Sequence, residues 1–427
     1  MAGNLTLGIS AALHGQDMSV DITQVTAEAM AGEQSMQLQL AEMYESGNGI
    51  TLDYGQAAHW YQKAALQGVA IAQSRLGQMY LRGYGVAEDH RLAVKWLRLA
   101  VEQDDASAQA NLAWCYQEGL GVGRDHHQAF ALYLLAAEQG HTGASYNLGF
   151  MYAGGVGTAR DPHRAVHWYL QAAERGHTRA QLNVGMMLAR GEGTKKDEYE
   201  AVRWYKEAAA KGYAKAQYNL GLMYMGGHGV AQDEQQAFYW IKKSAEQGYY
   251  KAQFNLGLLY LHGMGVERDY EDAFTQFARS AEQGYAKAAY QMAKMYQTGQ
   301  GVEVNEIEAI KCYQWAAERG YAKAQYRIGR VYLDGKGAQQ DRELACRWFE
   351  KAALQGYVKA QYILGICYAK GYGVVRDYQH SWAWLSLACE SGDASVVAMR
   401  DRIAGNLAGP ALEEARQLAL YWRGQYS

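Results

Sequence analysis

Glycine-rich loops are the part of this sequence that could most readily bind a charged ligand. Residues 220–230, LGLMYMGGHGV, end an amphipathic run in a Gly-x-Gly pair. A phosphate-binding loop would need a strand before it and a Lys-Ser or Lys-Thr after it, so that backbone N–H groups and the lysine hold the phosphate. Neither feature is present, and Lys336 lies in Gly-Lys-Gly instead. The glycines therefore indicate a structural role.

Spacings typical of catalytic sites are also missing. The sequence contains no Ser-x-x-Lys, no Gly-x-Ser-x-Gly and no His-Glu-x-x-His, which would supply an activated nucleophile or a zinc site. The twelve histidines are scattered, and the pair His126-His127 begins a predicted helix, where a solvated surface is the better interpretation. We therefore expect no catalytic residues, no metal and no cofactor.

Composition and charge exclude several further classes. Forty-one basic and forty-four acidic residues give a net charge of -3, which does not favour binding to nucleic acid or to anionic lipid. No apolar stretch approaches the roughly 18 residues of a membrane span. The first 21 residues contain no Lys or Arg and only an interrupted apolar run, so they do not resemble a secretory signal. These features predict a cytoplasmic protein without membrane insertion.

The sequence repeats with a period of 36 residues, which is the strongest structural signal in the chain. Ten copies follow one another in register, each with one Gly-x-Gly pair and most with a Tyr three residues before it. The pairs are Gly47/Gly49, Gly83/Gly85, Gly119/Gly121, Gly155/Gly157, Gly191/Gly193, Gly227/Gly229, Gly263/Gly265, Gly299/Gly301, Gly335/Gly337 and Gly371/Gly373.

Each copy is predicted to form two helices, because apolar residues recur at helical spacing on both sides of the glycines. An Asp or Asn stands four residues after the second glycine, as at Asp233 and Asn305, and is typical of a helix N-cap. Pro162 directly follows such a cap, at the first helical position. Glycines such as Gly212 are predicted to end the second helix in the left-handed conformation, and only Asp104 breaks that column.

The pattern A-x-x-x-L-G-x-x-Y-x-x-G-x-G-V-x-x-D-x-x-x-A-x-x-W-Y-x-x-A-A-x-x-G resembles the Sel-1-like repeat, a relative of the tetratricopeptide repeat. The resemblance covers residues 33–392 and implies an all-α fold, a right-handed superhelical solenoid of about ten helix-loop-helix repeats with a concave groove. Residues 1–32 are predicted to be an N-terminal segment with a partial repeat, and residues 393–427 to be capping helices that cover the end of the stack.

The cysteines fit this repeat rather than redox chemistry. Four of the five, Cys115, Cys312, Cys367 and Cys389, stand where other copies carry Met, Trp or Ala. We expect all five to be reduced, buried core residues without a disulfide or metal role. The column Asn111, Asn147, Asn183, Asn219 and Asn255 adjoins the Leu-Gly pair, and we expect its side chains to hydrogen-bond between neighbouring repeats.

The groove is the predicted binding site, by resemblance to tetratricopeptide repeats. We expect an apolar strip, flanked by aromatic residues and by a basic zone that would select an acidic part of the partner. The strip comprises Trp114, Phe150, Met186, Leu222 and Leu258, with Tyr218, Phe254 and Tyr290 beside it; the basic zone comprises Lys287, Lys294, Lys323, Arg330 and Lys359. Two alternatives stay open, because such apolar residues can fill gaps between helices and such lysines can be a solvated face.

The resemblance implies a non-enzymatic scaffold or adaptor that binds a protein or peptide in its groove. Sel-1-like repeat proteins serve in bacterial signalling, envelope assembly, secretion and host interaction, so a regulator, chaperone or immunity factor for a bacterial effector is one variant. The alternative is a receptor for a small or cell-wall-derived ligand, or a hydrolase using the groove. Few acidic residues, such as Glu42, Glu118 and Asp334, stand in the groove columns, which disfavours the hydrolase.

Overall fold

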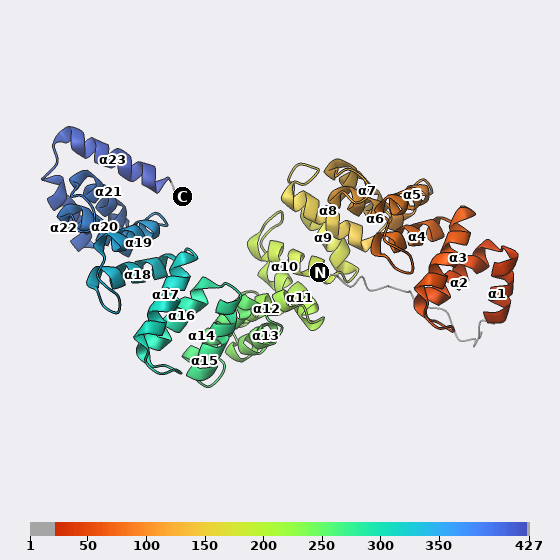
Figure 1. The fold of residues 1–427 in the computed structure, drawn as a ribbon, viewed down its shortest axis with the longest axis horizontal. Helices are drawn as coiled ribbons and strands as arrows, with labels where there is room; N and C mark the ends of the chain where they lie inside the picture. Colours follow the sequence, from red (N-terminus) through yellow and green to blue (C-terminus); the bar gives the residue numbers. More distant parts are fainter. Residues whose placement is uncertain (1–21, 425–427) are drawn as a thin grey trace. The chain divides into compact units, whose positions relative to one another are not determined.

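The computed structural model describes residues 22–424, and this part of the chain contains helices and no strands (Figure 1). The chain forms two compact units, residues 1–197 and residues 198–427, which are described separately. The N-terminal segment predicted above lies outside the described residues up to position 21. Its last part is helix α1 (Ile22–Ala31), in keeping with a partial repeat.

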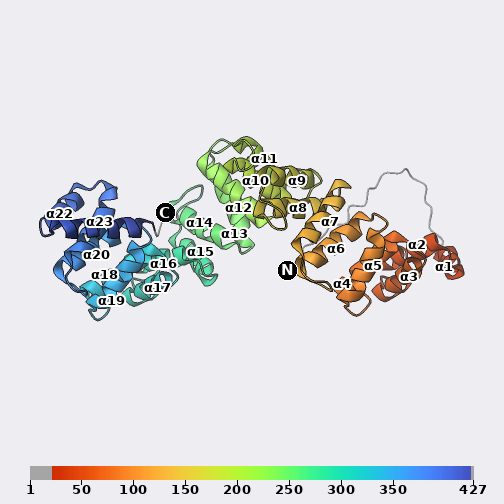
Figure 2. The ribbon, with the colours of Figure 1, turned by 90° about the horizontal axis from the view of Figure 1, so that it is seen from above.

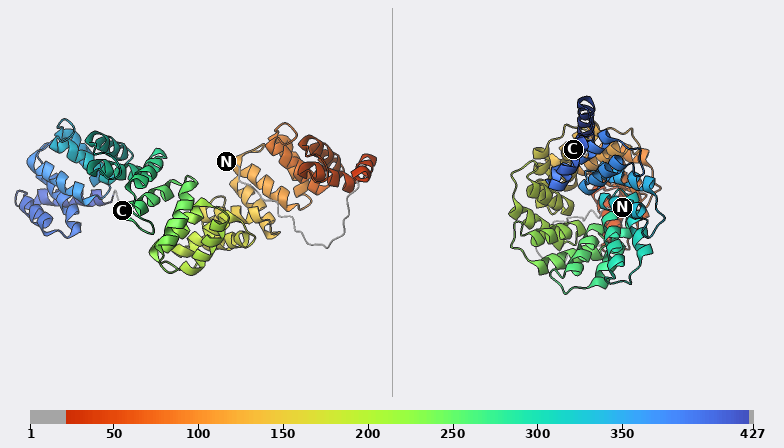
Figure 3. Two further views of the ribbon diagram at one scale, coloured as in Figure 1. Left: turned by 90° about the horizontal axis from the view of Figure 1, so that it is seen from below. Right: turned by 90° about the vertical axis from the view of Figure 1, so that its left-hand side faces the viewer.

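Both units are built from consecutive helix pairs, which can be followed by colour in Figures 2 and 3. In each repeat an even-numbered first helix is followed by an odd-numbered second helix. The first unit continues with α2 (Gln34–Ser46), α3 (Tyr54–Leu66), α4 (Ala70–Arg82), α5 (His90–Val101), α6 (Ala106–Glu118), α7 (His126–Glu138), α8 (Thr142–Gly154), α9 (Pro162–Glu174) and α10 (Thr178–Arg190).

The second unit begins with the second helix of the repeat whose first helix is α10. It comprises α11 (Glu198–Ala210), α12 (Ala214–Gly226), α13 (Glu234–Glu246), α14 (Tyr250–His262), α15 (Tyr270–Glu282), α16 (Ala286–Thr298), α17 (Glu306–Glu318), α18 (Ala322–Asp334), α19 (Arg342–Ala353), α20 (Val358–Lys370), α21 (Tyr378–Ala388), a short 3-10 turn (Cys389–Ser391), α22 (Ala394–Ala404) and α23 (Gly409–Arg423).

The helix ends follow the predicted capping chemistry. The Asp233 carboxylate accepts a hydrogen bond from the backbone N–H of Gln236, and the Asn305 side chain accepts one from Glu308. Pro162 occupies the first turn of α9. The glycines after the second helices adopt positive φ, such as 83° at Gly212, and Asp104 keeps this conformation with φ 58°, the one positive value among the described non-glycine residues.

Glycine is needed at the two positions of the loop for different physical reasons. The first, such as Gly263 with φ 70°, ends the first helix in the left-handed conformation. The second lies against the preceding repeat: a Cβ on Gly265 would lie 2.0 Å from the carbonyl oxygen of Glu234, at the start of α13. Any side chain there would displace one repeat from the next. Sequence reasoning identified the loop but not this contact.

The core is a small-residue interface between first and second helices. Buried alanines such as Ala216 and Ala237 let the helices approach closely, and the glycine of the Leu-Gly pair receives a large residue from the second helix. A Cβ on Gly221 would lie 2.6 Å from Cγ1 of Ile241, which is fully buried. The repeats that carry this glycine therefore pack one large side chain of the second helix against it, and alanine takes its place in three others, as at Ala293.

Buried glutamines join the repeats by hydrogen bonds. Gln217 is only 4 % exposed; its Nε2 donates to the carbonyl oxygen of Ala209 in the preceding repeat (3.2 Å), and its Oε1 accepts from Nε2 of Gln247 in its own repeat (2.7 Å). The same arrangement recurs at Gln73/Gln103, Gln253/Gln283 and Gln325/Gln355. Each of these glutamines fixes its own repeat and the contact to the one before it.

Helix α23 closes the second unit. Its Trp422 ring stacks on Trp384 of α21 with ring centroids 3.9 Å apart, and Leu418 packs against the same core cluster. Arg423 forms an ion pair with Glu390. A repeat helix without a following repeat would expose its apolar side, and both α22 and α23 pack against α21. That these helices cap the stack stays a prediction.

Candidate partner-binding surface

The predicted site lies on one face of the first helices. On α12, Lys215, Tyr218 and Leu222 stand at positions i, i+3 and i+7, so they share one side of the helix. The same three positions recur on all the other first helices. We call this side the first-helix face and describe it for each unit separately.

In the first unit the apolar strip is exposed. Phe150 on α8 is 52 % exposed and Trp114 on α6 is 38 % exposed, although both are large apolar side chains. Met186, at the equivalent position of α10, is half-buried. Adjacent exposed aromatic residues are uncommon on a surface that has no partner. This part of the strip thus differs from gap-filling packing.

In the second unit the side chains of the apolar strip are less exposed than Trp114 and Phe150. Leu222 on α12 and Leu258 on α14 are half-buried, and Leu258 packs against the core cluster of this unit. Tyr218, Phe254 and Tyr290 also pack against that cluster while remaining half-exposed. The predicted strip thus falls on two units, and its use as one binding surface stays a prediction.

A set of tyrosines that sequence reasoning left out joins this face. The residue before each first helix of the second unit is a Tyr, and from Tyr249 onward its ring contacts the aromatic residue in the second turn of the preceding first helix. Tyr249 lies 5.3 Å from Tyr218, Tyr285 lies 5.1 Å from Phe254, and Tyr321 lies 5.2 Å from Tyr290, as ring centroid distances. The recurring motif Gly-Tyr-Ala-Lys-Ala-Gln-Tyr carries both tyrosines and was the signal for them.

We call the set of these rings on the first-helix face of the second unit the tyrosine belt. Its members are Tyr213, Tyr218, Tyr249, Tyr250, Phe254, Tyr285, Tyr290, Tyr321, Tyr326 and Tyr357, all half-buried. Burial raises the pKa of Tyr218 to about 12, and its hydroxyl accepts a hydrogen bond from Nδ2 of Asn255 in the next repeat (2.8 Å). The Tyr218 phenol therefore remains neutral at physiological pH. The Asn255 bond also confirms, at that position, the prediction that the asparagine column joins neighbouring repeats.

The basic zone is present but uneven. Lys287, Lys294, Lys323 and Lys359 are exposed on α16, α18 and α20. Arg330 differs, because its guanidinium forms an i,i+4 ion pair with Asp334 (2.9 Å). Its positive charge is therefore partly balanced within α18, which the column pattern alone did not indicate.

No group of three His, Cys, Asp or Glu side chains in residues 22–424 is placed to hold a metal ion. All five cysteines are free thiols; Cys115, Cys346 and Cys367 are buried, whereas Cys312 and Cys389 are only half-buried, so the expectation of full burial is wrong for these two. His127 is exposed, as expected, but His126 is half-buried and its Nδ1 atom is buried, so a fully solvated pair is wrong for His126.

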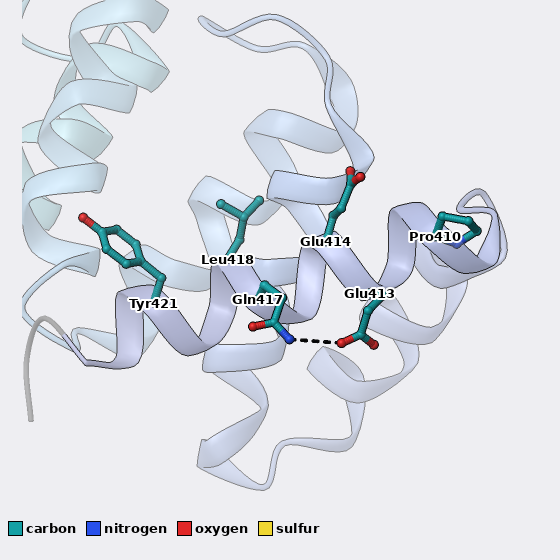
Figure 4. Close-up of a pocket in the computed structure, with 6 residues that line it drawn as sticks. All are labelled: Pro410, Glu413, Glu414, Gln417, Leu418 and Tyr421. Carbon is teal, nitrogen blue, oxygen red and sulfur yellow. Dashed lines mark hydrogen bonds between the residues drawn. The ribbon is translucent and has the colours of Figure 1, made fainter.

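A shallow hollow lies away from the predicted site. It measures about 600 Å³ and is formed along one stripe of α23 by Pro410, Glu413, Glu414, Gln417, Leu418 and Tyr421 (Figure 4). Gln417 donates a hydrogen bond to Glu413 within this stripe (3.0 Å). Its two carboxylates stand beside apolar side chains on one helix, without an opposing wall, so the arrangement does not resemble an enclosed ligand site. Among the helices of residues 22–424, none is both long and apolar enough to cross a bilayer.

Comparison with known proteins identifies the family. The model of the Sel1 repeat matches ten consecutive segments: 34–69, 70–105, 106–141, 142–177, 178–213, 214–249, 251–285, 286–321, 322–357 and 358–393. No curated protein matches the chain significantly.

Solved structures agree with this assignment. A protective antigen present in uropathogenic Escherichia coli strains, displaying an SLR fold, is 33% identical over 95% of this chain and 95% of that chain, with a TM-score of 0.65. A Sel1 repeat protein from Oxalobacter formigenes is 35% identical over 72% of this chain and 89% of that chain, with a TM-score of 0.61. The protein therefore belongs to the Sel1 repeat family and is an all-α solenoid of ten repeats.

Proposed function

We infer that the protein is a non-enzymatic scaffold or adaptor that binds a protein partner through its first-helix faces. Solenoids of this family generally mediate protein–protein interaction, and the two similar structures described above come from bacteria. The function fits a cytoplasmic regulator or chaperone of a bacterial effector, secretion or envelope system.

One observation carries the proposal: Trp114 and Phe150 are exposed at equivalent positions of two successive first helices. Aromatic side chains that lose water in the middle of an interface supply much of its binding energy. Burying the exposed part of a ring this size is worth roughly 1–2 kcal/mol at about 25 cal/mol per Å². A folded repeat gains nothing from leaving both rings in water, whereas a partner's apolar side chain would cover them.

The test is affinity capture from host lysate, with mass spectrometry, comparing the wild type with Phe150→Glu/Leu222→Glu. A matched control, Leu99→Glu/Leu135→Glu, introduces the same charges at exposed apolar positions of the second helices α5 and α7. Circular dichroism verifies that all variants keep their helices. We expect a small set of captured proteins to disappear with the first variant alone, and identical captures from all three proteins would refute the proposal.

A further inference from the structure

The charged residues on the first-helix face of the second unit are almost all basic. Its five first helices α12, α14, α16, α18 and α20 carry one lysine each at the same position, and we call this set the lysine ladder: Lys215, Lys251, Lys287, Lys323 and Lys359. All five are exposed. Lys294, Arg327, Arg330 and Lys370 add to them. Within these five described helices the single acidic residue is Asp334, which Arg330 already pairs.

The negative charges of the unit stand on the other helices. Each of α11, α13, α15, α17 and α19 carries at least two acidic residues, such as Glu234 and Glu246 on α13. The acidic residues of these helices are therefore confined almost entirely to the second helices, which also carry basic residues such as Lys242 and Lys243 on α13. The charged residues of the first helices are basic apart from Asp334, although the whole chain is nearly neutral. None of the ion pairs described for this unit involves a lysine of the ladder. A face of one sign attracts and orients a partner of the opposite sign.

The tyrosine belt lies beside the lysine ladder and bears on the class of partner. Its rings pack mostly edge to face, with interplanar angles of 74° for Tyr218–Tyr249, 74° for Phe254–Tyr285 and 80° for Tyr290–Tyr321. Single-stranded nucleic acids bind aromatic surfaces by stacking bases on free ring faces. Here the rings use their faces and edges on one another, so the belt is poorly suited to base stacking. Phenol hydroxyls instead suit a polypeptide, because they donate to carbonyl and carboxylate oxygens.

We propose that the first-helix face of the second unit binds an extended acidic polypeptide segment, whose carboxylates pair with the lysine ladder while its backbone runs along the tyrosine belt. This inference rests on the proposed function and names the chemistry of its partner. Successive first helices come within side-chain reach of one another, as the bond from Asn255 on α14 to Tyr218 on α12 shows. At a spacing of about 10 Å, five ladder positions span roughly 40 Å. An extended chain advances about 3.3 Å per residue, and the bound segment is therefore about 12 residues long.

The experiment selects binders from a displayed library of random 12-residue peptides on the full-length protein. We expect the selected peptides to be several-fold enriched in Asp and Glu over the library. In Lys287→Glu/Lys323→Glu the affinity of these peptides falls about ten-fold, because two exposed ion pairs become repulsions. The matched control Lys63→Glu/Lys95→Glu changes the charge equally on exposed second-helix positions of the first unit and leaves the affinity unchanged. Should the double Glu variant lose helical content, Lys287→Gln/Lys323→Gln replaces it.

Three results would overturn the proposal. One is a selection without acidic enrichment, and the second is an equal loss of affinity in the control variant. The third is a labelled 12-nucleotide oligo-dT that binds more tightly than the best peptide with the same dependence on Lys287 and Lys323. The two proposals can fail separately. A captured protein that Phe150→Glu/Leu222→Glu loses and Lys287→Glu/Lys323→Glu keeps would refute the acidic segment alone, and the proposed function would stand.

Discussion

The close approach of the second loop glycine to the preceding repeat can be tested by one matched pair of substitutions. Gly265→Ala would place a Cβ 2.0 Å from the carbonyl oxygen of Glu234, whereas real Cβ contacts are not shorter than 3.0 Å. Gly49→Ala occupies the same loop position in the first repeat, where the nearest atoms, on Ile22 and Met43, are 3.6 Å away. Both glycines have similar φ, 69° and 77°, so the backbone strain of alanine is shared.

The expected magnitudes follow from these contacts. Alanine in the left-handed conformation costs roughly 1–2 kcal/mol, and its lower entropy in the unfolded chain returns about 0.4–1 kcal/mol. We therefore expect Gly49→Ala to lower the free energy of unfolding by about 1 kcal/mol. In Gly265→Ala the loop and the start of α13 must also separate by about 1 Å, and overpacking of this kind adds roughly 1–3 kcal/mol. The total for Gly265→Ala is about 2–4 kcal/mol.

Hydrogen exchange with mass spectrometry is the appropriate assay, because the repeats of a solenoid can open locally. We expect faster exchange in α13, α14 and α15 of Gly265→Ala, and a smaller effect confined to α2 and α3 in Gly49→Ala. Urea unfolding followed by circular dichroism gives the global change. Equal destabilisation by the two substitutions would refute the reasoning, because only the contact with the preceding repeat distinguishes them.

Three further predictions concern the interior and the helix ends. The cycle of Gln217→Ala, Gln247→Ala and the double variant should give a coupling of about 1 kcal/mol in urea unfolding, as expected for one neutral hydrogen bond; additive effects would contradict the bond. Asp104→Gly should raise the free energy of unfolding by about 0.5 kcal/mol, since glycine adopts the observed positive φ without strain, whereas Gly140→Asp at the equivalent cap should lower it. Burial raises the pKa of Tyr218 and Tyr313 to about 12, above the value of about 10 in an unfolded chain. Their contribution is complete below pH 10 and is lost as the pH rises through 12, so circular dichroism should show alkaline unfolding in that interval; Tyr218→Phe should make it shallower, and an unchanged profile would contradict the assignment.

Local rules explain why so much of the fold could be predicted from the sequence. An Asp before a helix caps it by accepting hydrogen bonds from backbone N–H groups two or three residues away, and a glycine after a helix adopts positive φ. The roles of Asp233 and Gly212 can therefore be predicted without knowledge of the fold. Because the sequence repeats ten times with a period of 36 residues, one reliable local assignment applies to ten repeats. The family, the helices and the candidate face all follow from these signals, because each depends on residues that are close in the chain.

The tertiary structure decided what depends on distances between repeats. Phe150 and Leu222 occupy the same column, yet Phe150 is 52 % exposed and Leu222 is half-buried, because neighbouring side chains and not the column set exposure. The tyrosine belt arises from ring contacts between residues such as Tyr218 and Tyr249, which are far apart in the sequence. The second glycine of most loops, such as Gly265, likewise lies against a backbone carbonyl of the preceding repeat. Sequence periodicity places such residues on a face, but only the packing of one helix against the next determines which of them meet and which remain in water.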